Sequence, residues 1–263
     1  MKIKITLLGA GNVGFHLAKR LHECGHQICQ VLSRDLNKAK ELSQVVQAAA
    51  IDSTEAINLQ ASVYIIAIKD KYIAQFQQKI SFLAQENKIV VHTSGAVSSQ
   101  VFNPNFSRCG VFYPLQSFSR IEPTNFEKLP FCIYAKDPQT ENILFELAQT
   151  ICPNVYRIND EERAILHVTA VIVNNFSNYL YGVAHHICQD HQIPFDLLKA
   201  LIAKTARNIE QHPPHRVQTG PAVRKDKNTI SKHLDFLEKY PDYQNIYQLL
   251  SNGIAQQKKD SKK

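Results

Sequence analysis

The fold is decided by the stretch Lys2-Ile-Lys-Ile-Thr-Leu-Leu-Gly-Ala-Gly-Asn-Val-Gly14 near the N-terminus. Residues 2–8 form an apolar run with β-branched members, which predicts a strand. The glycine motif follows at once, and residues 15–24 show the helical spacing of apolar side chains. A strand, a glycine turn and a helix in this order are typical of the first unit of a Rossmann fold.

Each glycine of the motif has its own mechanical task. Gly9 permits the tight turn, Gly11 lets the backbone approach a pyrophosphate, and Gly14 lets the helix pack against the strand. Main-chain amides at the helix start then face the diphosphate. The motif alone is weak evidence because glycine turns are common, but a second strand at residues 27–32 strengthens it. The residues expected to contact a dinucleotide here are Gly9, Ala10, Gly11, Asn12, Val13 and Gly14.

The end of the second predicted strand indicates which dinucleotide is bound. An acidic residue there would hydrogen-bond the ribose 2′-hydroxyl of NAD and repel the 2′-phosphate of NADP. Ser33 and Arg34 occupy the place, and a hydroxyl beside a guanidinium suits a phosphate dianion, with Lys38 as a third contact. NADP(H) is therefore the expected cofactor. The alternative is that Asp35 takes the ribose while Arg34 lies in solvent.

Strand and helix patterns alternate through the first half of the chain. Further strands are predicted at residues 48–52, 61–68, 88–92, 110–113, 131–135 and 155–158, with helices between them. This alternation predicts an α/β fold with a doubly wound, mostly parallel sheet. Ligands of such sheets lie beyond the carboxyl ends of the strands. The residues expected there are Ile68, Lys69, Ser94 and Gly95 as cofactor contacts, and His92 and Gln116 as substrate contacts.

Strand signals vanish from Asp160 onward. Helical patterns cover residues 161–189, 195–210, 229–239 and 243 to about 257. The sequence therefore predicts an NADP-binding Rossmann domain at residues 1–159. An all-helical domain for substrate binding and dimerisation is expected at residues 160–263.

Composition narrows the possible partners. The chain has 44% hydrophobic residues but no apolar stretch of eighteen, so a membrane span is not expected. The net charge of +7 owes much to four lysines in a polar C-terminal tail, Lys258, Lys259, Lys262 and Lys263. Without basic and aromatic residues interleaved, no nucleic-acid partner is expected.

The six cysteines form no CxxC pair and are expected to be free thiols. His186 and Asp190 lack a third metal ligand, so no metal site is expected. The chain opens on a strand, so no signal peptide and a cytoplasmic location are expected.

Several stretches together carry a family resemblance. They are residues 9–14, His92-Thr-Ser-Gly-Ala96, Pro114-Leu-Gln-Ser-Phe118, residues 167–176, and Thr219-Gly-Pro221 with Arg224 and Asp226. On these, the chain resembles NADP oxidoreductases of the 6-phosphogluconate dehydrogenase-like superfamily that join a Rossmann-like N-terminal domain to a helical C-terminal domain of unassigned function. The superfamily includes 3-hydroxyisobutyrate dehydrogenase and pyrroline-5-carboxylate reductase. The resemblance implies a homodimer formed through the helical domain.

The resemblance also suggests where chemistry occurs. Dehydrogenases of the superfamily carry a lysine and, four residues later, an asparagine on the helix that opens the second domain. That spacing lands on Val171 and Asn175, so the acid/base lysine is missing. His167 stands one turn earlier and can give or take a proton near pH 7, while Ser94 can orient the substrate. His167, Asn175 and Ser94 are therefore the catalytic candidates. A packing role for His167 and a simple turn at Ser94 are the structural alternatives.

Further substrate contacts are expected on the same helix and in a later loop. At α-helical spacing, positions 167, 171, 174, 175 and 178 lie along one side, which brings Asn174 and Asn178 beside His167. Arg224 follows Thr219-Gly-Pro221 and can grip a carboxylate from a partner subunit, or the loop can simply be solvated. Two departures from the family pattern stand nearby: Tyr113 replaces the histidine expected before Pro114, and Lys225 replaces the glycine expected after Arg224.

Two functions remain open at this point. The first is an NADPH-dependent reductase acting on a small carbonyl or imine bound between the domains, which the joint presence of His167, Ser94 and Asn175 favours. The second is a non-catalytic NADP(H)-binding regulatory or sensor protein, which the missing lysine favours.

Overall fold

The computed structural model describes the backbone of residues 2–260 and the side chains of residues 2–257. The chain divides into two compact units, one up to Asn174 and one from Asn175 onward. The four lysines of the C-terminal tail lie outside the described side chains. None of the described helices is long and apolar enough to cross a membrane.

An eight-stranded sheet in the order β3-β2-β1-β4-β5-β6-β7-β8 forms the centre of the first unit. The strands are β1 (Lys4–Leu8), β2 (Gln27–Leu32), β3 (Ala49–Ile51), β4 (Val63–Ile66), β5 (Ile89–His92), β6 (Cys109–Pro114), β7 (Phe131–Ala135) and β8 (Val155–Arg157). Every pair is parallel except β6 and β7, which run antiparallel. This confirms the predicted α/β fold with a doubly wound, mostly parallel sheet.

The central strands are buried because helices cover both faces of the sheet. All residues of β4, β5 and β6 are buried, as their continuous apolar character requires. In the register of the sheet, Leu8 lies beside both Leu32 and Ile66. The loops that follow β1, β2 and β4 therefore emerge side by side at one edge, which is the carboxyl edge where ligands of such sheets bind.

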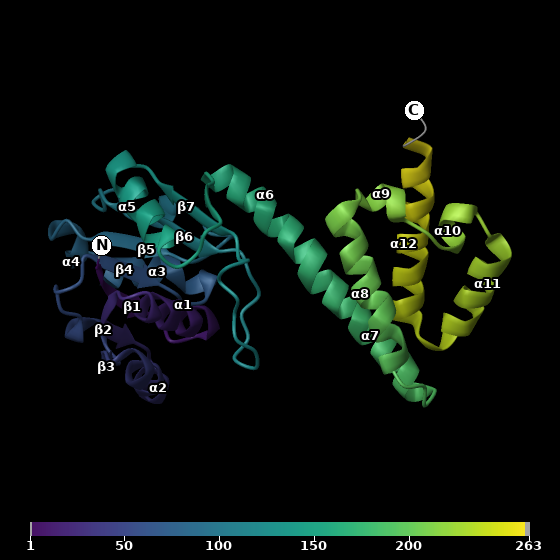
Figure 1. Cartoon of the computed structure of the whole chain (residues 1–263), viewed down its shortest axis with the longest axis horizontal. Coiled ribbons are helices and arrows are strands. Elements are labelled where there is room, and N and C mark those ends of the chain that lie inside the picture. Colours follow the sequence, from purple (N-terminus) through teal and green to yellow (C-terminus); the bar gives the residue numbers. More distant parts are fainter. Residues whose placement is uncertain (1, 261–263) are drawn as a thin grey trace. The chain divides into compact units, whose positions relative to one another are not determined.

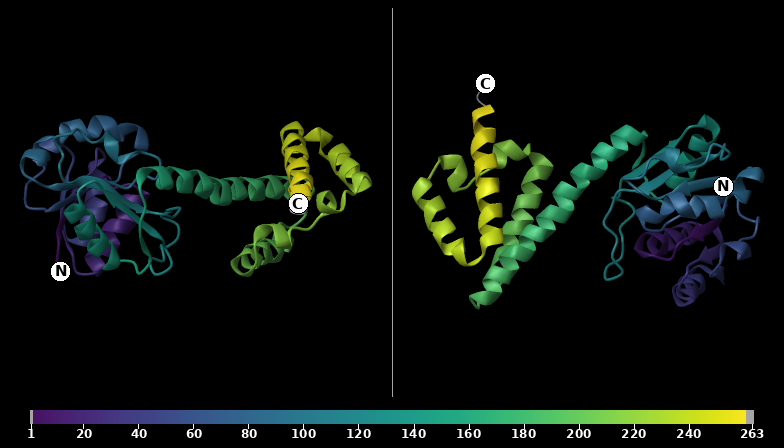
Figure 2. Two further views of the ribbon diagram at one scale, coloured as in Figure 1. Left: turned by 90° about the horizontal axis from the view of Figure 1, so that it is seen from above. Right: turned by 180° about the vertical axis from the view of Figure 1, so that it is seen from behind.

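Two helical layers enclose this sheet, as Figures 1 and 2 show. Helices α1 (Asn12–Glu23), α2 (Leu36–Val46) and α5 (Pro138–Gln149) share one large core with the sheet. The opposite face packs against α3 (Ile73–Lys79), α4 (Phe82–Gln85), the 3₁₀ turn η3 (Ser99–Val101) and Ile57, which follows the 3₁₀ turn η1 (Thr54–Ala56). Another turn, η2 (Asp70–Tyr72), follows β4.

A third, small apolar cluster joins the sheet to the helix that follows it. Val111 and Tyr113 of β6 and Cys132 of β7 are buried there, with Leu166 of α6 (Asp160–Ala170) packed against them. The helix α6 begins with a capping box formed by Asn159 and Glu162, so its start is fixed by the sequence itself. Leu166 thus anchors α6 where the carboxyl end of β6 lies beside the amino end of β7.

The long helix predicted at residues 161–189 is not α-helical throughout. A π-helix, η4 (Val171–Phe176), separates α6 from α7 (Ser177–Asp190). Because π hydrogen bonds run from residue i to i+5, each π turn holds one more residue than an α turn. The α-helical spacing that placed residues 167, 171, 174, 175 and 178 along one side is therefore wrong beyond Val171.

The second unit is helical in its described part. Its further elements are α8 (Asp196–Gln211), α9 (Pro214–Val217), α10 (Pro221–Arg224), α11 (Lys227–Phe236), η5 (Leu237–Lys239) and α12 (Pro241–Asp260). Helix α12, yellow in Figure 1, packs against α10 and α11. The short helices α9 and α10 were not predicted, since each is a single turn that begins at a proline.

Candidate functional site

The glycine loop after β1 has the geometry expected of a dinucleotide-binding turn. Gly9 adopts a φ of +131°, and a methyl group there would overlap the carbonyl oxygen of Ala67. A methyl group on Gly14 would overlap the carbonyl oxygen of Gly9, so Gly14 allows α1 to pack on the strand. A methyl group on Gly11 would meet no atom within 4 Å. The space beside Gly11 is therefore open to a ligand.

The residues at this turn fit a diphosphate. Gly11 is the N-cap of α1, makes no side-chain capping bond, and the first turn of the helix carries no acidic residue. Amides at such a helix start point outward, and the helix dipole favours a negative charge there. Asn12, Val13 and Gly14 supply that first turn. The open space, the uncapped amides and the absence of acid together suit the pyrophosphate of a dinucleotide.

Polar and charged residues follow the end of β2, where the ribose of a dinucleotide is expected. Asp35 is the N-cap of α2, where its carboxylate accepts hydrogen bonds from the amides of Asn37 and Lys38 and lies 3.8 Å from the ammonium of Lys38. Oδ1 of Asp35 therefore caps α2, while the side chain stays half exposed. Arg34 is exposed, and its guanidinium carbon lies 5.3 Å from the centre of the Tyr72 ring. The hydroxyl of Ser33 accepts a hydrogen bond from the amide of Asp35.

The loop between β6 and β7, which includes residues 115–118 of the Pro114-Leu-Gln-Ser-Phe118 stretch, contacts the glycine turn. The guanidinium of Arg120 donates to the carbonyl of Ala10 at 3.1 Å and pairs with Glu41 at 2.7 Å. It also lies over the ring of Phe15 of α1 at 4.5 Å. Asn12 of α1 donates to the carbonyl of Phe118 in the same loop. The segment between β6 and β7 thus packs over the glycine turn and hydrogen-bonds to Ala10 and Asn12.

The loop after β5 is built around two buried polar side chains. Nδ1 of His92 accepts a hydrogen bond from the amide of Ser94, and the Ser94 hydroxyl accepts from the amides of Ala96 and Val97. His92 has no exposed surface and Ser94 is 5% exposed. Burial lowers the pKa of His92 to about 4, and the Arg163 charge adds to this effect. His92 is therefore neutral at pH 7, and its side chain lies buried beneath the β5 loop.

Tyr113, His167 and Gly95 meet at the carboxyl edge of β5 and β6. The Tyr113 hydroxyl lies 3.4 Å from Nδ1 of His167, and the centres of the two rings are 6.4 Å apart. A methyl group on Gly95 would come within 2.6 Å of Nδ1 of His167 and 2.8 Å of the Tyr113 hydroxyl. Only glycine at position 95 lets the two side chains approach each other. Burial raises the pKa of Tyr113 to about 12.

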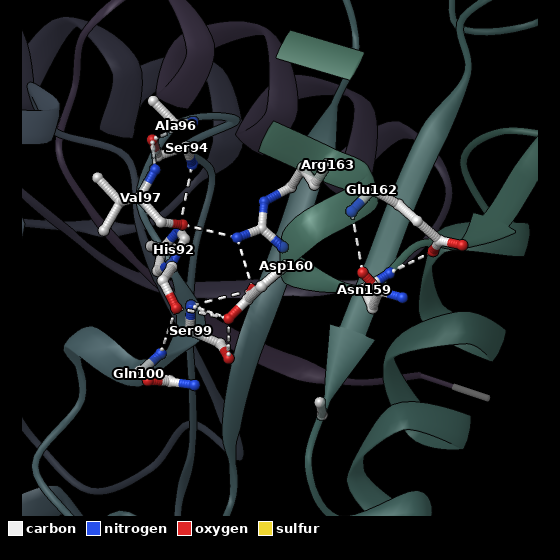
Figure 3. A network of polar contacts seen from close by, with 12 residues as sticks. His92, Ser94, Ala96, Val97, Ser99, Gln100, Asn159, Asp160, Glu162 and Arg163 are labelled. Carbon is white, nitrogen blue, oxygen red and sulfur yellow. Dashed lines mark hydrogen bonds and ion pairs between the residues drawn. The ribbon is translucent and has the colours of Figure 1, made fainter. Parts of the chain in front are cut away.

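Figure 3 shows the network of hydrogen bonds that fixes the start of α6 on the β5 loop. Nη2 of the fully buried Arg163 donates to the Val97 carbonyl and to Asp160, both at 2.7 Å. The carboxylate of Asp160 accepts from the amide of Ser99 and from the hydroxyls of Ser98 and Ser99. Burial alone would raise the pKa of Asp160, but these hydrogen bonds outweigh burial and lower it.

The remaining residues expected at the site are spread over both units. Ile68 is half-buried against Gly9, while Lys69 and Gln116 are exposed in the loops after β4 and β6. Asn174, Asn175 and Asn178 are exposed on η4 and α7, and Arg224 is the last residue of α10. Within the first unit, the structure brings Gly95, the residue after Ser94, against His167. The roles expected of Asn174, Asn175, Asn178 and Arg224 stay predictions.

Sequence reasoning missed Arg163 and Asp160 as site-forming residues. The available signal is an acidic residue, Asp160, at the start of a predicted helix, which by itself indicates only a favourable charge at the helix N-terminus. The partner residues in the β5 loop lie more than sixty positions away, and no local pattern reveals such contacts.

Among the described residues, no three or more His, Cys, Asp or Glu side chains gather as a metal ion would require. His186 and Asp190 lie 3.7 Å apart on α7, and the His186 imidazole contacts the Tyr243 hydroxyl at 2.8 Å. The six cysteines are free thiols.

Comparison with known proteins identifies both parts of the chain. Residues 4–95 match the family model described as "NADP oxidoreductase coenzyme F420-dependent", and residues 129–254 match a domain of unknown function, DUF2520. No curated protein matches the sequence.

Solved structures extend the likeness to the whole chain. A "putative NADP oxidoreductase" from Bacteroides fragilis is 37% identical over 97% of this chain and 98% of its own, with a TM-score of 0.91. An imine reductase from Myxococcus stipitatus in complex with NADP+ shares the fold at 12% identity, over 98% of this chain and 93% of its own, with a TM-score of 0.66. A pyrroline-5-carboxylate reductase from Coxiella burnetii does so at 11% identity, over 97% and 99%, with a TM-score of 0.59. The chain therefore belongs to the family of NADP oxidoreductases that join a Rossmann-like N-terminal domain to a helical C-terminal domain of unknown function.

Proposed function

We propose that the chain is an NADPH-dependent reductase that transfers hydride to a small carbonyl or imine. The observation that carries this proposal is the juxtaposition, in one unit, of an open glycine turn and a proton-bearing pair. Gly11 and the uncapped start of α1 stand beyond β1, and the Tyr113 and His167 side chains stand beyond β6. Two strands, β4 and β5, separate β1 from β6 in the sheet. A ligand that runs along the carboxyl edge from β1 reaches that pair.

Preference for NADPH over NADH rests on the end of β2. Arg34 is exposed and carries the charge that a 2′-phosphate needs, while Oδ1 of Asp35 caps α2. The fold is shared with an imine reductase that was solved in complex with NADP+. Bound NADPH would supply the hydride, and the side chains of the chain would bind the substrate, exclude water and hold the proton.

The roles of individual residues in this proposal follow from their contacts. Lys69 and the amides of Ser94 and Gly95 border the nicotinamide end, since they follow β4 and β5. The oxygen of the Ser94 hydroxyl accepts from two amides, so its own hydrogen is left to orient a substrate oxygen. His167 is half-buried, so that one side of its ring can exchange protons with water.

A titration with each coenzyme tests the cofactor. The protein has no tryptophan, so the fluorescence of the coenzyme itself can be followed without interference. We expect NADPH to bind more tightly than NADH. Arg34→Gln should weaken NADPH binding by about tenfold or more, the loss of one charge-assisted hydrogen bond of roughly 1.5 kcal/mol. NADH binding should be unaffected. Arg157→Gln, an exposed arginine at the end of β8, is the matched control. Tighter binding of NADH would exclude the assignment.

A substrate screen tests the reaction. Small oxo acids and cyclic imines are incubated with NADPH, and the loss of absorbance of the reduced coenzyme is recorded. Turnover of any of them supports the reductase.

The second candidate function is an NADP(H)-binding sensor without catalysis, which the hydrophobic Val171 at the position of the superfamily lysine favours. Tight NADPH binding without any turnover in the screen would favour the sensor over the reductase.

We also propose that the helical unit pairs with a second copy of the chain. Leu197 and Leu201 stand one turn apart on α8 and are 72% and 61% exposed. Phe176 and Tyr179 are exposed by more than half as well. Exposed apolar side chains gathered on neighbouring helices are typical of protein interfaces, and most such assemblies are symmetric dimers.

A further inference from the structure

We propose that Tyr113 is the group that donates the proton to the reduced substrate, and that His167 returns a proton to the Tyr113 phenol. This assignment rests on the reductase function proposed above and gives that function its acid. It makes the departure from the family pattern at position 113 a chemical feature of the site.

The geometry of the pair is the first support. The Tyr113 hydroxyl faces Nδ1 of His167 at 3.4 Å, which is long for a hydrogen bond, but catalytic bonds of this kind tighten when ligands bind. Gly95 lies against both side chains and leaves no room for a side chain of its own. The two rings thus meet over a glycine in the loop that is expected to border the nicotinamide.

The surroundings of Tyr113 are the second support. Tyr113 is 9% exposed and packs in an apolar cluster with Val111, Cys132 and Leu166. A site with few water molecules strengthens electrostatic interactions between the phenol and a substrate atom that gains negative charge. The hydroxyl is the polar end of an otherwise apolar side chain and stands where β6 ends.

Burial and the neighbouring charges together determine the protonation state of the Tyr113 phenol. Burial is the main reason why the pKa of Tyr113 rises to about 12. The Cys132 thiol on β7 and the Asp70 carboxylate after β4 raise the pKa further, while Arg163 on α6 lowers it. The fourth titratable group that faces the phenol is His167 itself. The phenol therefore keeps its proton at neutral pH and is available as an acid.

The proton transfer balances as follows. Hydride adds to the substrate carbon, the π bond of the C=O or C=N group breaks, and its electron pair moves to oxygen or nitrogen. That atom takes the proton from the Tyr113 hydroxyl, and Nδ1–H of His167 gives its proton to the phenolate oxygen. Nε2 of His167 takes a proton from water at the half-buried side of the ring, and proton exchange with water then returns the ring to its Nδ1–H form for the next turnover. The coenzyme is oxidised by two electrons, the substrate is reduced by two, and one proton enters from solvent.

This scheme requires that the neutral His167 ring carries its hydrogen on Nδ1. Nitrogen-15 NMR of the full-length protein reports the tautomer directly, because protonated and unprotonated ring nitrogens have well-separated shifts. We expect His167 to be protonated on Nδ1 in the wild type and to shift in Tyr113→Phe. In Tyr134→Phe, the control on the neighbouring strand, the His167 spectrum should stay unchanged. An identical His167 spectrum in the wild type and Tyr113→Phe would overturn the pairing without any substrate.

Kinetics then test the role of the pair. With a substrate found in the NADPH screen, Tyr113→Phe should lower kcat about 100-fold or more, the usual contribution of general acid catalysis. Its affinity for NADPH, followed by coenzyme fluorescence, should equal that of the wild type. Tyr134→Phe should keep its kcat. A wild type that turns over no substrate defeats the reductase function itself. If the wild type is active and Tyr113→Phe has the same kcat, the assignment of Tyr113 as the acid is wrong, while the reductase function stands.

Discussion

Gly9 and Gly11 stand two positions apart, yet a methyl group should affect them in opposite ways. Gly9 has a positive φ and lies against the Ala67 carbonyl, so Gly9→Ala should lower the free energy of unfolding by more than about 2 kcal/mol. Gly11 has an ordinary φ and open space beside it. Gly11→Ala should fold normally but bind NADPH at least about tenfold more weakly, a loss of roughly 1.4 kcal/mol. Chemical denaturation and coenzyme fluorescence measure the two effects. Equal stability of both variants would contradict this reading of the turn.

The buried His92 gives the fold a dependence on pH. Its pKa is lowered to about 4, below the value of about 6.5 in an unfolded chain. The unfolded state therefore binds a proton first as pH falls, and the stability contributed by neutral His92 is lost between about pH 6.5 and pH 4. We expect the free energy of unfolding to fall across this window by about 3 kcal/mol. His92→Asn keeps an acceptor for the Ser94 amide and should show a shallower slope. The same slope in both proteins would assign the effect to other groups, such as His26.

At the scale of elements, the strands were the most predictable feature. Strands β4, β5 and β7 lie within or coincide with their predicted ranges because the buried strands of this mostly parallel sheet are continuous apolar runs bounded by polar residues. The π-helix at Val171–Phe176 was not predictable, because its sequence has the same apolar and amide residues as an ordinary helix. Its place beside the expected catalytic positions agrees with the frequent occurrence of π turns at functional sites.

The contacts that build the site were less predictable than the loops that carry it. The glycine turn and the β5 loop follow from local sequence, and the structure places both at the carboxyl edge of the sheet. The meeting of Tyr113 with His167 joins residues 54 positions apart. Such a contact depends on how α6 packs on β6 and β7, and a single sequence contains no signal for that packing.

At the start of α6, removing one partner of the Arg163–Asp160 ion pair should destabilise the fold more than replacing both partners. Arg163 is fully buried, and two of its three guanidinium nitrogens find no partner within the described part of the chain. Asp160→Asn leaves this charge without its counterion and should cost about 3 kcal/mol of stability. Adding Arg163→Met removes the stranded charge and should restore part of that loss. Urea denaturation of the single and double variants checks this. A double variant no more stable than Asp160→Asn would contradict the stranded Arg163 charge as the cause of the loss.

At the scale of the whole molecule, the sequence predicted a sheet-containing half and a helical half. Compact units divide the chain at Asn174, within the π-helix, so the first turns of α6 belong with the sheet by their contacts. The expected division into an NADP-binding domain at residues 1–159 and a helical domain at residues 160–263 followed the change from strands to helices. The change from strands to helices marks where the secondary structure changes, but it does not show that α6 packs against the sheet.

Self-association is the expected property of the helical unit. Sedimentation equilibrium of the wild type should give a dimer, since Leu197 and Leu201 present apolar surface on α8. Leu201→Asp should shift the equilibrium to monomer by burying an unpaired charge in the interface. Leu59→Asp changes an exposed leucine of the first unit and should leave the dimer intact. A wild type that sediments as a monomer would contradict the proposal.

The most direct test of the central claim is the response of individual backbone amides to the coenzyme. Amide proton–nitrogen NMR spectra of the full chain are recorded with increasing NADPH. We expect the largest shifts at Gly11, Asn12, Val13 and Gly14, where the first turn of α1 offers its amides, with Arg34 also affected. Saturation with NADPH that leaves these amides unshifted would contradict dinucleotide binding at the glycine turn.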